Sequence, residues 1–497
     1  MAGIGFELQK LIRKGTLFST LKAFMFGSIL SAGPMILTVL CIGIIGWISY
    51  GLFHEGILRI FSVTIVYTFA FSLILTGPFQ LVFTRYVADK HFTKDLQDVY
   101  PGFLTSSVFI AGLALLVSVP FYSLMKVWVP VGNLLVYKIF AVLTFVVTCL
   151  VWQLMGFVST SKEYQKVAWS YFFGTILSIV LAFLLIPSIT VAGGLAGYCT
   201  GQILIAVLLY RITTKNLDKR QKWTNTYFSY LRKYHLIALN GLVFNIGLWV
   251  DKFLFWEHFK ESNGTSFFYT YNYYDVPYFL SFFSIIPAMA YFLILTETNF
   301  YKSYTAFVKD VLSQPLLLIE RKKKDMLDTL KEGMRGMLKL QGITTLLLIV
   351  FAEPVLVFLG YKGVSIWLFR ILLVGTFLHV VNMNLNIIFL YYEMRKRAFL
   401  LILLFLILNL VFTYISIQMG IRYFGFGFLA AGIITTSIAW PLLMQSMKRI
   451  DFYIFASQPI DSVVKIDKKN GRQRSRFFSK PGWWPGSNQD TKPESYN

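Results

Sequence analysis

Long apolar runs decide what this 497-residue chain can fold into. A helix that crosses a bilayer needs about 20 mostly apolar residues. Twelve runs reach that length: Lys22–Tyr50, Leu58–Thr84, Phe103–Met125, Leu134–Val158, Val167–Ile186, Thr190–Leu209, Leu236–Phe255, Pro277–Thr296, Leu340–Leu359, Ile366–Leu390, Phe399–Met419 and Phe424–Met444. We therefore predict an all-α polytopic membrane protein with about twelve transmembrane helices.

Composition agrees with this fold class. Hydrophobic residues make up 56% of the chain and charged residues only 14%, whereas ordinary soluble chains carry roughly 25% charged residues. So few charges cannot cover a soluble surface, which excludes a cytosolic enzyme and a disordered protein. A net charge of +22 would suggest nucleic acid as a partner in a soluble chain, so the distribution of the cations matters.

The cations gather on one side of the predicted membrane. With the N-terminus placed in the cytoplasm, 38 of the 46 Lys and Arg residues fall in inside segments. Cytoplasmic loops of membrane proteins carry such an excess. We therefore predict that both termini are cytoplasmic, that anionic lipids are partners of the cationic loops, and that nucleic acid is not a partner.

The spans divide into two sets of six. The predicted layout is a cytoplasmic amphipathic segment (1–21), an N-terminal lobe (22–210), a cytoplasmic link (211–235), a C-terminal lobe (236–447) with a cytoplasmic insert (302–339), and a basic, disordered cytoplasmic tail (448–497). Weak internal similarity relates Lys166 to Arg397, 231 residues apart, and Gly197 to Gly432, 235 residues apart. Six spans return a chain to the same side, so we predict parallel repeats around a central cavity.

Motifs for catalysis are missing from the sequence. There is no Gly-x-x-x-x-Gly-Lys-[Ser/Thr] loop for ATP and no His-Glu-x-x-His zinc site. Cys41, Cys149 and Cys199 lie in apolar runs and are expected to be packing residues. We expect no catalytic residue, cofactor or metal. A membrane glycosyltransferase would have to use Glu55, beside His54, and a solvated pair explains these two residues better.

Charged residues inside apolar spans are costly and suggest function. The candidates are Arg85, Asp251, Glu297 and Glu353. Arg85 and Glu297 lie near the cytoplasmic ends of their spans, where a long side chain can also reach the headgroups. Asp251 and Lys252 are adjacent, about 100° apart on a helix, so no tight ion pair is expected between them. Glu353 and Arg370, on neighbouring spans, could form a structural pair.

Polar and helix-breaking residues mark further candidates. His379, Asn382 and Asn386 share one face of span ten, where they can join helices by hydrogen bonds or line a wet cavity. Pro34, Pro78 and Pro287 interrupt spans one, two and eight, and broken helices often mark transporter paths. The aromatic segment 267–278 is typical of a membrane-interface belt, with stacking on saccharide as the alternative.

The insert combines a basic cluster with a helical pattern. Arg321, Lys322, Lys323 and Lys324 precede an apolar stripe formed by Met326, Leu327, Leu330 and Met334. We expect an amphipathic helix that lies on the anionic leaflet, a docking site for a partner protein, or both.

Several ordered segments resemble the PelG family of inner-membrane exopolysaccharide transporters. They are Met1–Leu11, Ser31–Pro34, Thr76–Tyr86, Trp249–Phe253 and Ser284–Ala288 followed by Glu297-Thr. The resemblance extends from residue 1 to about 455, and Glu297-Thr-Asn-Phe300 departs from a Glu-Thr-Asp-Phe form. It implies the multidrug/oligosaccharidyl-lipid/polysaccharide (MOP) exporter fold, with two six-helix lobes around a cavity, in a bacterial cytoplasmic membrane.

The resemblance also implies a function in biofilm matrix production. The expected substrate is a polymer rich in galactosamine and N-acetylgalactosamine. The expected partners are a cytoplasmic Pel glycosyltransferase and other Pel inner-membrane subunits, one of which senses a cyclic dinucleotide. Because a partly deacetylated polymer is cationic, we expect carboxylates along its path, with Asp251, Glu297 and Glu353 as candidates. The alternatives are an ion-coupled flippase of lipid-linked saccharides and a scaffold that anchors the glycosyltransferase.

Overall fold

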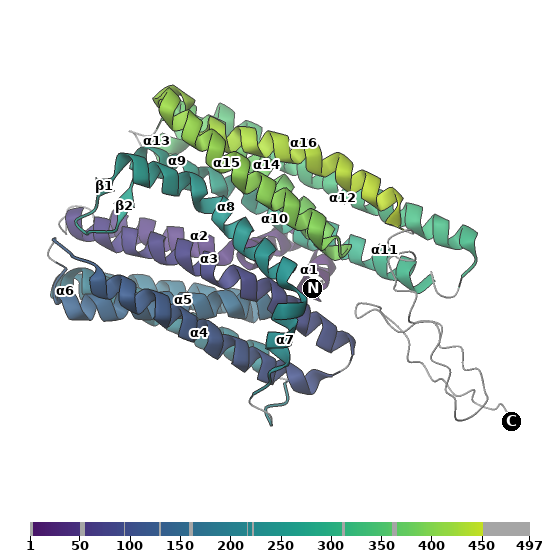
Figure 1. Cartoon of the computed structure of the whole chain (residues 1–497), viewed down its shortest axis with the longest axis horizontal. Coiled ribbons are helices and arrows are strands. Elements are labelled where there is room, and N and C mark those ends of the chain that lie inside the picture. Colours follow the sequence, from purple (N-terminus) through teal and green to yellow (C-terminus); the bar gives the residue numbers. More distant parts are fainter. Residues whose placement is uncertain are drawn as a thin grey trace.

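The computed structural model describes residues 3–49, 55–93, 95–128, 131–158, 163–215, 217–220, 223–310, 314–359 and 365–450. Nearly all of them are helical, and the helices form two adjacent bundles (Figure 1). The predicted basic tail from residue 451 and the side chains of the His54–Glu55 pair lie outside the described residues.

The N-terminal lobe contains six α-helices, of which the first has only ten residues. Its elements are α1 (Gly3–Ile12), α2 (Leu17–Ser49), α3 (Glu55–Phe92), η1 (Leu96–Asp98), α4 (Val99–Leu124), α5 (Leu134–Val158) and α6 (Tyr164–Thr214). Within α6, Thr190 has non-helical angles (φ 58°, ψ −136°). A Cβ on Gly197 would touch the backbone of Ala182, so the two halves of α6 fold back on each other as an antiparallel pair.

The C-terminal lobe follows a short connecting helix, α7 (Thr226–Lys233). Its elements are α8 (His235–Phe259), β1 (Glu261–Ser262), β2 (Tyr269–Thr270), α9 (Asn272–Phe282), η2 (Phe283–Ile285), α10 (Ile286–Tyr291), η3 (Phe292–Thr296), α11 (Glu297–Asp310), α12 (Leu316–Val350), α13 (Ala352–Phe358), α14 (Ile366–Tyr391), α15 (Arg395–Met419), η4 (Ile421–Tyr423) and α16 (Phe426–Lys448). The two short strands pair antiparallel and are the only sheet among the described residues.

The helices are long and apolar enough for a multi-pass membrane protein, as the sequence predicted. Nine described helices satisfy both conditions, and a tenth does if α12 and α13, which meet at 76°, are taken as one broken span. The 51 residues of α6 exceed the roughly 20 residues of one crossing, in agreement with its two antiparallel halves. The count of twelve crossings and the cytoplasmic location of both termini stay predictions.

The prolines of spans one and two do not end their helices, contrary to the sequence prediction. Pro78 lies inside α3, which stays helical from Glu55 to Phe92, and α2 likewise continues past Pro34. Neighbouring helices can satisfy a carbonyl that a proline leaves free. Pro78 leaves the carbonyl of Ile74 without its helical donor, and Asn245 Nδ2 of α8 donates beside it, to the Leu73 carbonyl oxygen at 2.9 Å. Pro287 does mark a change, from the 3₁₀ turn η2 to α10.

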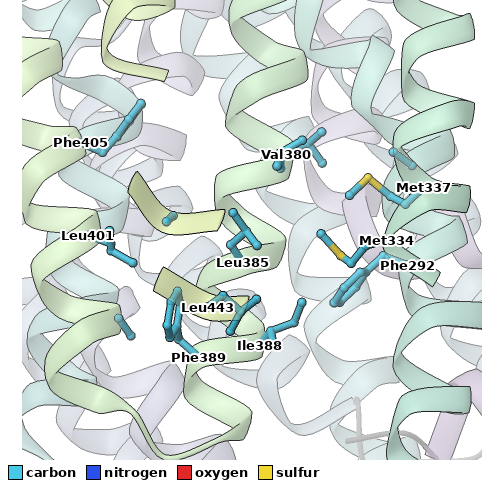
Figure 2. Packing of buried hydrophobic residues seen from close by; sticks show 14 of the residues in the cluster. Phe292, Met334, Met337, Val380, Leu385, Ile388, Phe389, Leu401, Phe405 and Leu443 are labelled. Carbon is cyan, nitrogen blue, oxygen red and sulfur yellow. The ribbon is translucent and has the colours of Figure 1, made fainter. Parts of the chain in front are cut away.

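The C-terminal lobe has a large apolar core, and the predicted insert is part of it (Figure 2). A smaller cluster lies where α13 packs on α14. Met326, Leu330 and Met334 of α12 are buried, and Met334 lies beside Phe292 in Figure 2. The apolar stripe of the insert therefore faces protein, so the expected helix on the bilayer surface is wrong. Both α11 and the first half of α12 extend the lobe at its predicted cytoplasmic end.

The two lobes meet mainly through α3 and α8, and through α2 and α10. A Cβ on Gly77 of α3 would lie 2.7 Å from the carbonyl oxygen of Gly241 in α8, closer than real Cβ contacts allow. The two helix backbones thus touch at this pair of glycines. The predicted Gly197–Gly432 correspondence is not matched in packing, since Gly432 faces Leu378 of α14 while Gly197 faces its own hairpin partner.

Candidate functional site

A cavity of about 150 Å³ lies between the lobes. It is bounded by α2, α3, α8 and α9, in the half of each helix that the topology prediction places toward the outside. Its lining is Thr38, Val39, Ile42, Gly43, Val66, Phe69, Leu248, Trp249, Lys252, Tyr278, Phe279 and Phe282. Apolar and aromatic side chains dominate the lining, and Lys252 is the one charged residue among these described residues.

Lys252 forms a buried ion pair with its neighbour Asp251, contrary to the sequence expectation. Its Nζ lies 3.3 Å from Asp251 Oδ1 and donates to the Leu248 carbonyl oxygen at 2.8 Å. The ammonium also sits 3.3 Å from the centroid of the Tyr278 ring. The angle between adjacent positions constrains the Cβ atoms, but a four-carbon side chain can bend back along the helix to reach its neighbour.

The carboxylates of this region lie behind the cavity wall. Asp251 is fully buried and accepts a hydrogen bond from the Tyr274 hydroxyl at 2.7 Å. Asp275 accepts from Trp256 Nε1 at 2.8 Å and from the Tyr271 backbone N–H at 3.1 Å. Asp275 is not among the residues predicted from the sequence, although an acid in the first turn of a helix after an aromatic run is a recognisable signal.

A network of charges joins the lobes at the predicted cytoplasmic end. We call Arg85, Asp89, Tyr234, Glu393 and Arg395 the interlobe network. Arg85 of α3 pairs with Asp89 at 2.9 Å and with Glu393 in the turn between α14 and α15. Arg395 donates to Glu393 at 2.6 Å and lies 4.4 Å above the Tyr234 ring. The Tyr234 hydroxyl donates to Asp89 at 3.1 Å, which closes the network.

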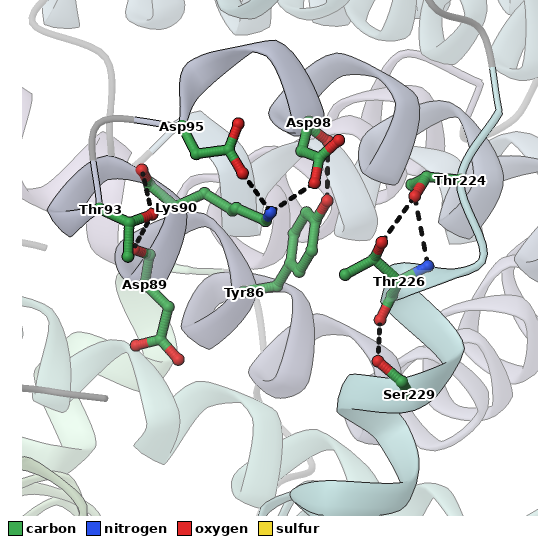
Figure 3. Close-up of polar contacts among 9 residues, drawn as sticks. All are labelled: Tyr86, Asp89, Lys90, Thr93, Asp95, Asp98, Thr224, Thr226 and Ser229. Atoms are coloured by element: carbon green, nitrogen blue, oxygen red, sulfur yellow. Dashed lines mark hydrogen bonds and ion pairs between the residues drawn. The ribbon is translucent and has the colours of Figure 1, made fainter. Parts of the chain in front are cut away.

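The end of α3 is anchored by a second cluster (Figure 3). The Lys90 ammonium pairs with Asp95 at 2.6 Å and also with Asp98, while the Tyr86 hydroxyl donates to the Asp98 carbonyl oxygen at 2.7 Å. In Figure 3 Asp89 points away from this cluster. The two adjacent residues therefore have different contacts. Lys90 holds the turn within the N-terminal lobe, and Asp89 faces the other lobe.

Glu297 approaches the same α14–α15 turn from the other side. Its buried carboxylate accepts a hydrogen bond from the Tyr391 hydroxyl, two residues before Glu393. Glu393 itself has a left-handed backbone (φ 57°), a conformation that non-glycine residues hold only when surrounding contacts enforce it. Arg85 and Glu297, singled out separately from the sequence, thus contact residues two apart, Glu393 in the turn and Tyr391 at the end of α14. We call this predicted cytoplasmic end, where the interlobe network joins the lobes, the closed end.

The amphipathic N-terminal segment is also part of this closed end. Gln9 of α1 donates to Asn299 Oδ1 at 2.7 Å and accepts from Lys302 Nζ at 2.7 Å. A Cβ on Gly5 would lie 2.7 Å from the Leu293 carbonyl oxygen. The helix is thus held against η3 and α11 of the opposite lobe, and Asn299, where the sequence departs from the resembled form, is one of its contacts.

At the opposite end, a hairpin of the C-terminal lobe (Glu261–Thr270) reaches the N-terminal lobe. Thr265 forms an antiparallel bridge with Val127, and the Trp128 N–H donates to the Gly264 carbonyl oxygen at 2.9 Å. The Tyr67 ring stacks on Trp256 with centroids 4.8 Å apart. The cavity is therefore bounded at both ends by contacts between the lobes.

The polar stripe of α14 lies in the interior of the C-terminal lobe and not along the cavity. Asn386 and Asn240 of α8 exchange two amide hydrogen bonds of 3.1 Å, and Asn382 donates to the Gly432 carbonyl oxygen of α16 at 3.3 Å. His379 is buried against four rings, those of Phe244, Phe282, Phe405 and Phe428. Of the two interpretations left open, the contacts of Asn382 and Asn386 fit hydrogen bonding between helices, whereas His379 Nδ1 is buried without a hydrogen-bond partner among the described residues.

Glu353 lies apart from the other candidates. It is exposed in the first turn of α13, and the bend between α12 and α13 carries it to the surface of the lobe. Arg370 donates to the Ile349 carbonyl oxygen at 3.0 Å, and no ion pair joins it to Glu353 in the described part of the chain. None of Asp251, Glu297 and Glu353 lines the cavity, so the structure does not bring the expected row of carboxylates together there, and their place along a path stays a prediction.

Possible metal ligands and the three cysteines are the remaining candidate groups within the described ranges. No group of three or more His, Cys, Asp or Glu side chains is arranged there to hold a metal ion. The three cysteines are buried and free, and Cys41 lies in an apolar cluster with Trp249.

Comparisons with known proteins assign a family and a fold. The PelG family of exopolysaccharide exporters (EPS-E) matches residues 1–455, while curated protein sequences give no significant match. An outward-facing MATE-family multidrug resistance transporter of the MOP superfamily is similar in structure (TM-score 0.60, 12% identity, 86% of this chain and 96% of that chain covered). A MOP-superfamily transporter from Pyrococcus furiosus is also similar (TM-score 0.62, 13% identity, 86% of this chain and 96% of that chain covered). So is an inward-facing MATE transporter (TM-score 0.57, 13% identity, 84% of this chain and 96% of that chain covered).

Proposed function

The chain belongs to the PelG family of exopolysaccharide exporters and has the fold of a MOP-superfamily transporter, and from that premise we propose that it exports an amino-sugar polymer through the interlobe cavity. The family and fold indicate a multi-pass transporter of the bacterial cytoplasmic membrane and not an enzyme. The amino-sugar chemistry, the route and the membership in a synthase complex are our proposals.

The composition of the cavity is the observation that carries the proposal. Aromatic faces supply flat apolar surface on which the C–H faces of sugar rings can stack, and Trp249, Tyr278 and Phe282 are three of its lining residues. A small number of polar groups among apolar ones is typical of ligand pockets. A cavity between two lobes is also where a transporter of this architecture can expose a ligand to either side in turn.

The closed end must open for polymer to enter from the cytoplasm. Entry requires separation of Arg85 from Glu393 and movement of α1 away from α11. Ion pairs and hydrogen bonds between rigid bodies are suited to such rearrangement, because they can be exchanged for water or substrate contacts. The glycine contact between α3 and α8, nearer the middle of the molecule, is then the pivot.

We place the docking surface for the glycosyltransferase at the start of α12. Arg321 and Lys324 are exposed there, on the helical pair that extends past the lobe at the predicted cytoplasmic end. The apolar stripe of the same helix (Met326, Leu330 and Met334) is buried inside the lobe. The surface that a partner can contact at Arg321 and Lys324 is therefore charged and not apolar. Acidic patches on the glycosyltransferase, or on a further inner-membrane subunit of the complex, would complement it.

Translocation in vesicles tests the proposal against its alternatives. The purified chain is reconstituted with its glycosyltransferase on the outside of vesicles, in the orientation that places α12 outside, and labelled polymer is assayed for protection from added glycosidase. Export predicts protected polymer that grows with synthesis. A flippase of lipid-linked saccharides predicts protected lipid-linked units without polymer, and a scaffold predicts synthesis with no protection.

A further inference from the structure

The bend between α12 and α13 leaves backbone carbonyls without helical donors. α12 ends at Val350, and α13 continues from Ala352 at an angle of 76°, so the last carbonyls of α12 lack the N–H groups that a continuing helix would supply. Arg370 of α14 contacts one of them, since its Nε donates to the Ile349 carbonyl oxygen at 3.0 Å. A cation at the C-terminal end of a helix also interacts favourably with the helix dipole. The guanidinium is thus held at the bend.

Most of the donors of this guanidinium have no protein partner. A guanidinium carries five N–H donors, and only the one on Nε has an acceptor among the described residues. Arg370 is exposed, so protein does not enclose the four donors on its two terminal nitrogens. Glu353, the one acid of α13, forms no ion pair with it within the described ranges. The partner of these donors therefore comes from outside the described chain.

The surface around Arg370 is apolar. Trp367 and Val374, three residues before and four residues after it, share its face of α14 and are both exposed. On the neighbouring α12, Leu346 and Val350 are exposed as well. Since α14 is long and apolar enough to cross a bilayer, and a large exposed apolar face marks a membrane or protein contact, we take this face to be in contact with lipid.

The position of Arg370 along α14 determines which lipid group it can reach. Arg370 is the fifth residue of the helix, about 6 Å along the axis from the first. Trp367 beside it is a residue type typical of the membrane interface. A long basic side chain at this depth can extend to the headgroups, and a charge left against acyl chains without a partner is costly. The anion available at that level is the phosphate of a phospholipid.

We propose that Arg370 binds the phosphate of a phospholipid headgroup at the α12–α13 bend. A guanidinium can donate two parallel hydrogen bonds to two phosphate oxygens, which uses the terminal nitrogens while Nε stays on Ile349. The site is independent of the proposed export. It lies at the end of the molecule that carries the β1–β2 hairpin, opposite α11 (Figure 1), whereas the lipids expected from the sequence are those of the cationic loops at the other end.

α13 supplies an apolar surface beside this site. Ala352 and Leu356 are buried against Phe369 of α14, whereas Phe358 is 89% exposed. A short helix that leaves the direction of α12 by 76°, with one apolar side on protein and another facing outward, is suited to lie in the membrane interface. An acyl chain of the bound lipid can pack along Phe358, so that the lipid links α13 to α14.

Thermal unfolding of the purified full chain in an uncharged detergent, with one additive at a time, tests the proposal. The additives are phosphatidylglycerol, digalactosyldiacylglycerol with the same acyl chains and no phosphate, and inorganic phosphate. We expect phosphatidylglycerol to raise the unfolding midpoint in a manner that saturates with its concentration, as binding to the native state does. The glycolipid and inorganic phosphate should not reproduce that rise.

Variants separate Arg370 from general effects of charge. Arg370→Gln should raise the half-saturating concentration of phosphatidylglycerol at least about tenfold, the size of one hydrogen bond to a charged group. The control is Arg59→Gln. Arg59 is also exposed and also the fifth residue of its helix, at the same end of the molecule, but it has no orphan carbonyl to hold it among the described residues. This variant should change the half-saturating concentration less than about twofold.

The outcomes either support the proposal or overturn it. A saturable effect of phosphatidylglycerol that Arg370→Gln weakens and Arg59→Gln retains supports it. Equal weakening in both variants, or an equal rise with the glycolipid, overturns it, because charge or acyl chains alone would then suffice. An equal rise with inorganic phosphate overturns the lipid as the ligand. No rise with any additive also overturns the proposal, and if Arg370→Gln then abolishes co-purification of a membrane subunit, a protein helix is the occupant. If Arg370→Gln does not fold, the three additives on the unaltered chain decide.

Discussion

Arg85 in α3 and Glu393 in the turn between α14 and α15 form an ion pair across the boundary of the two lobes. Both side chains are less than one-fifth exposed, so the pair is screened less by water than an ordinary surface pair. The pair belongs to a network that also includes Asp89, Tyr234 and Arg395, and it lies at the end of the molecule where α1 and Glu297 make further contacts with the opposite lobe.

Glu393→Gln should loosen this end, because it removes the charge that holds Arg85 and Arg395. A cysteine introduced at Thr38, in the cavity, should then react faster with a maleimide supplied from the cytoplasmic side. Cys41, Cys149 and Cys199 are replaced by alanine beforehand. In a double-mutant cycle with Arg85→Gln we expect a coupling energy of about 1–2 kcal/mol in unfolding. Unchanged labelling and no coupling would contradict the assignment of a closed end.

Gly77→Ala should be severely disruptive, because its Cβ would lie 2.7 Å from the Gly241 carbonyl oxygen. We expect a loss of stability of at least about 2 kcal/mol, or separation of the lobes, measured by thermal unfolding in detergent. The control is Gly112→Ala in α4, where a Cβ would meet no atom within 4 Å. There the substitution should be neutral or slightly stabilising. Equal effects at both positions would refute the close contact.

Asn386→Leu should destabilise the C-terminal lobe by about 1–3 kcal/mol, because it leaves the buried Asn240 amide without a partner. Adding Asn240→Leu should recover much of that loss, and secretion by the double variant should then be close to normal. Thermal unfolding and secreted polymer at equal protein abundance are the two measurements. Normal stability but no secretion in the double variant would instead place the pair in the transport path.

Arg321→Glu with Lys324→Glu should weaken co-purification with the glycosyltransferase by several-fold while leaving thermal stability within about 0.5 kcal/mol, as expected for exposed positions. Arg59→Glu with Lys138→Glu makes the same change of charge at the predicted outer end and should leave co-purification intact. A loss in both variants would point to net charge as the cause, and a loss in neither would place the docking surface elsewhere.

Hydrophobic pattern was sufficient to predict the helical class and the two-lobe order, because both depend on runs of about twenty residues. It also identified Arg85 and Glu297 as unusual, but not that they contact residues only two apart, Glu393 and Tyr391. The ion pair of Asp251 with Lys252 was missed because helix geometry fixes Cβ directions and not the reach of a long side chain. Contacts such as Asn386 with Asn240 depend on how separate helices are aligned, which a single sequence does not specify.

The same limit explains why the three carboxylates do not meet along the cavity. Asp251, Glu297 and Glu353 all lie within predicted spans. In the structure Asp251 is buried behind Lys252, Glu297 contacts Tyr391, and Glu353 is on the surface. Depth along a helix follows from sequence position, whereas the direction a side chain faces depends on tertiary packing.

A reversible lock across the outer end tests the central claim, that polymer passes between the lobes. Val127→Cys and Thr265→Cys lie at bridge partners, where antiparallel Cα atoms are about 4.5–5.5 Å apart and a disulfide can form. The background again lacks the three native cysteines, and each single-cysteine variant serves as a control. In the vesicle assay we predict that oxidation stops protection of labelled polymer and that a reductant restores it. Protection that continues at full rate with the disulfide formed would contradict passage between the lobes.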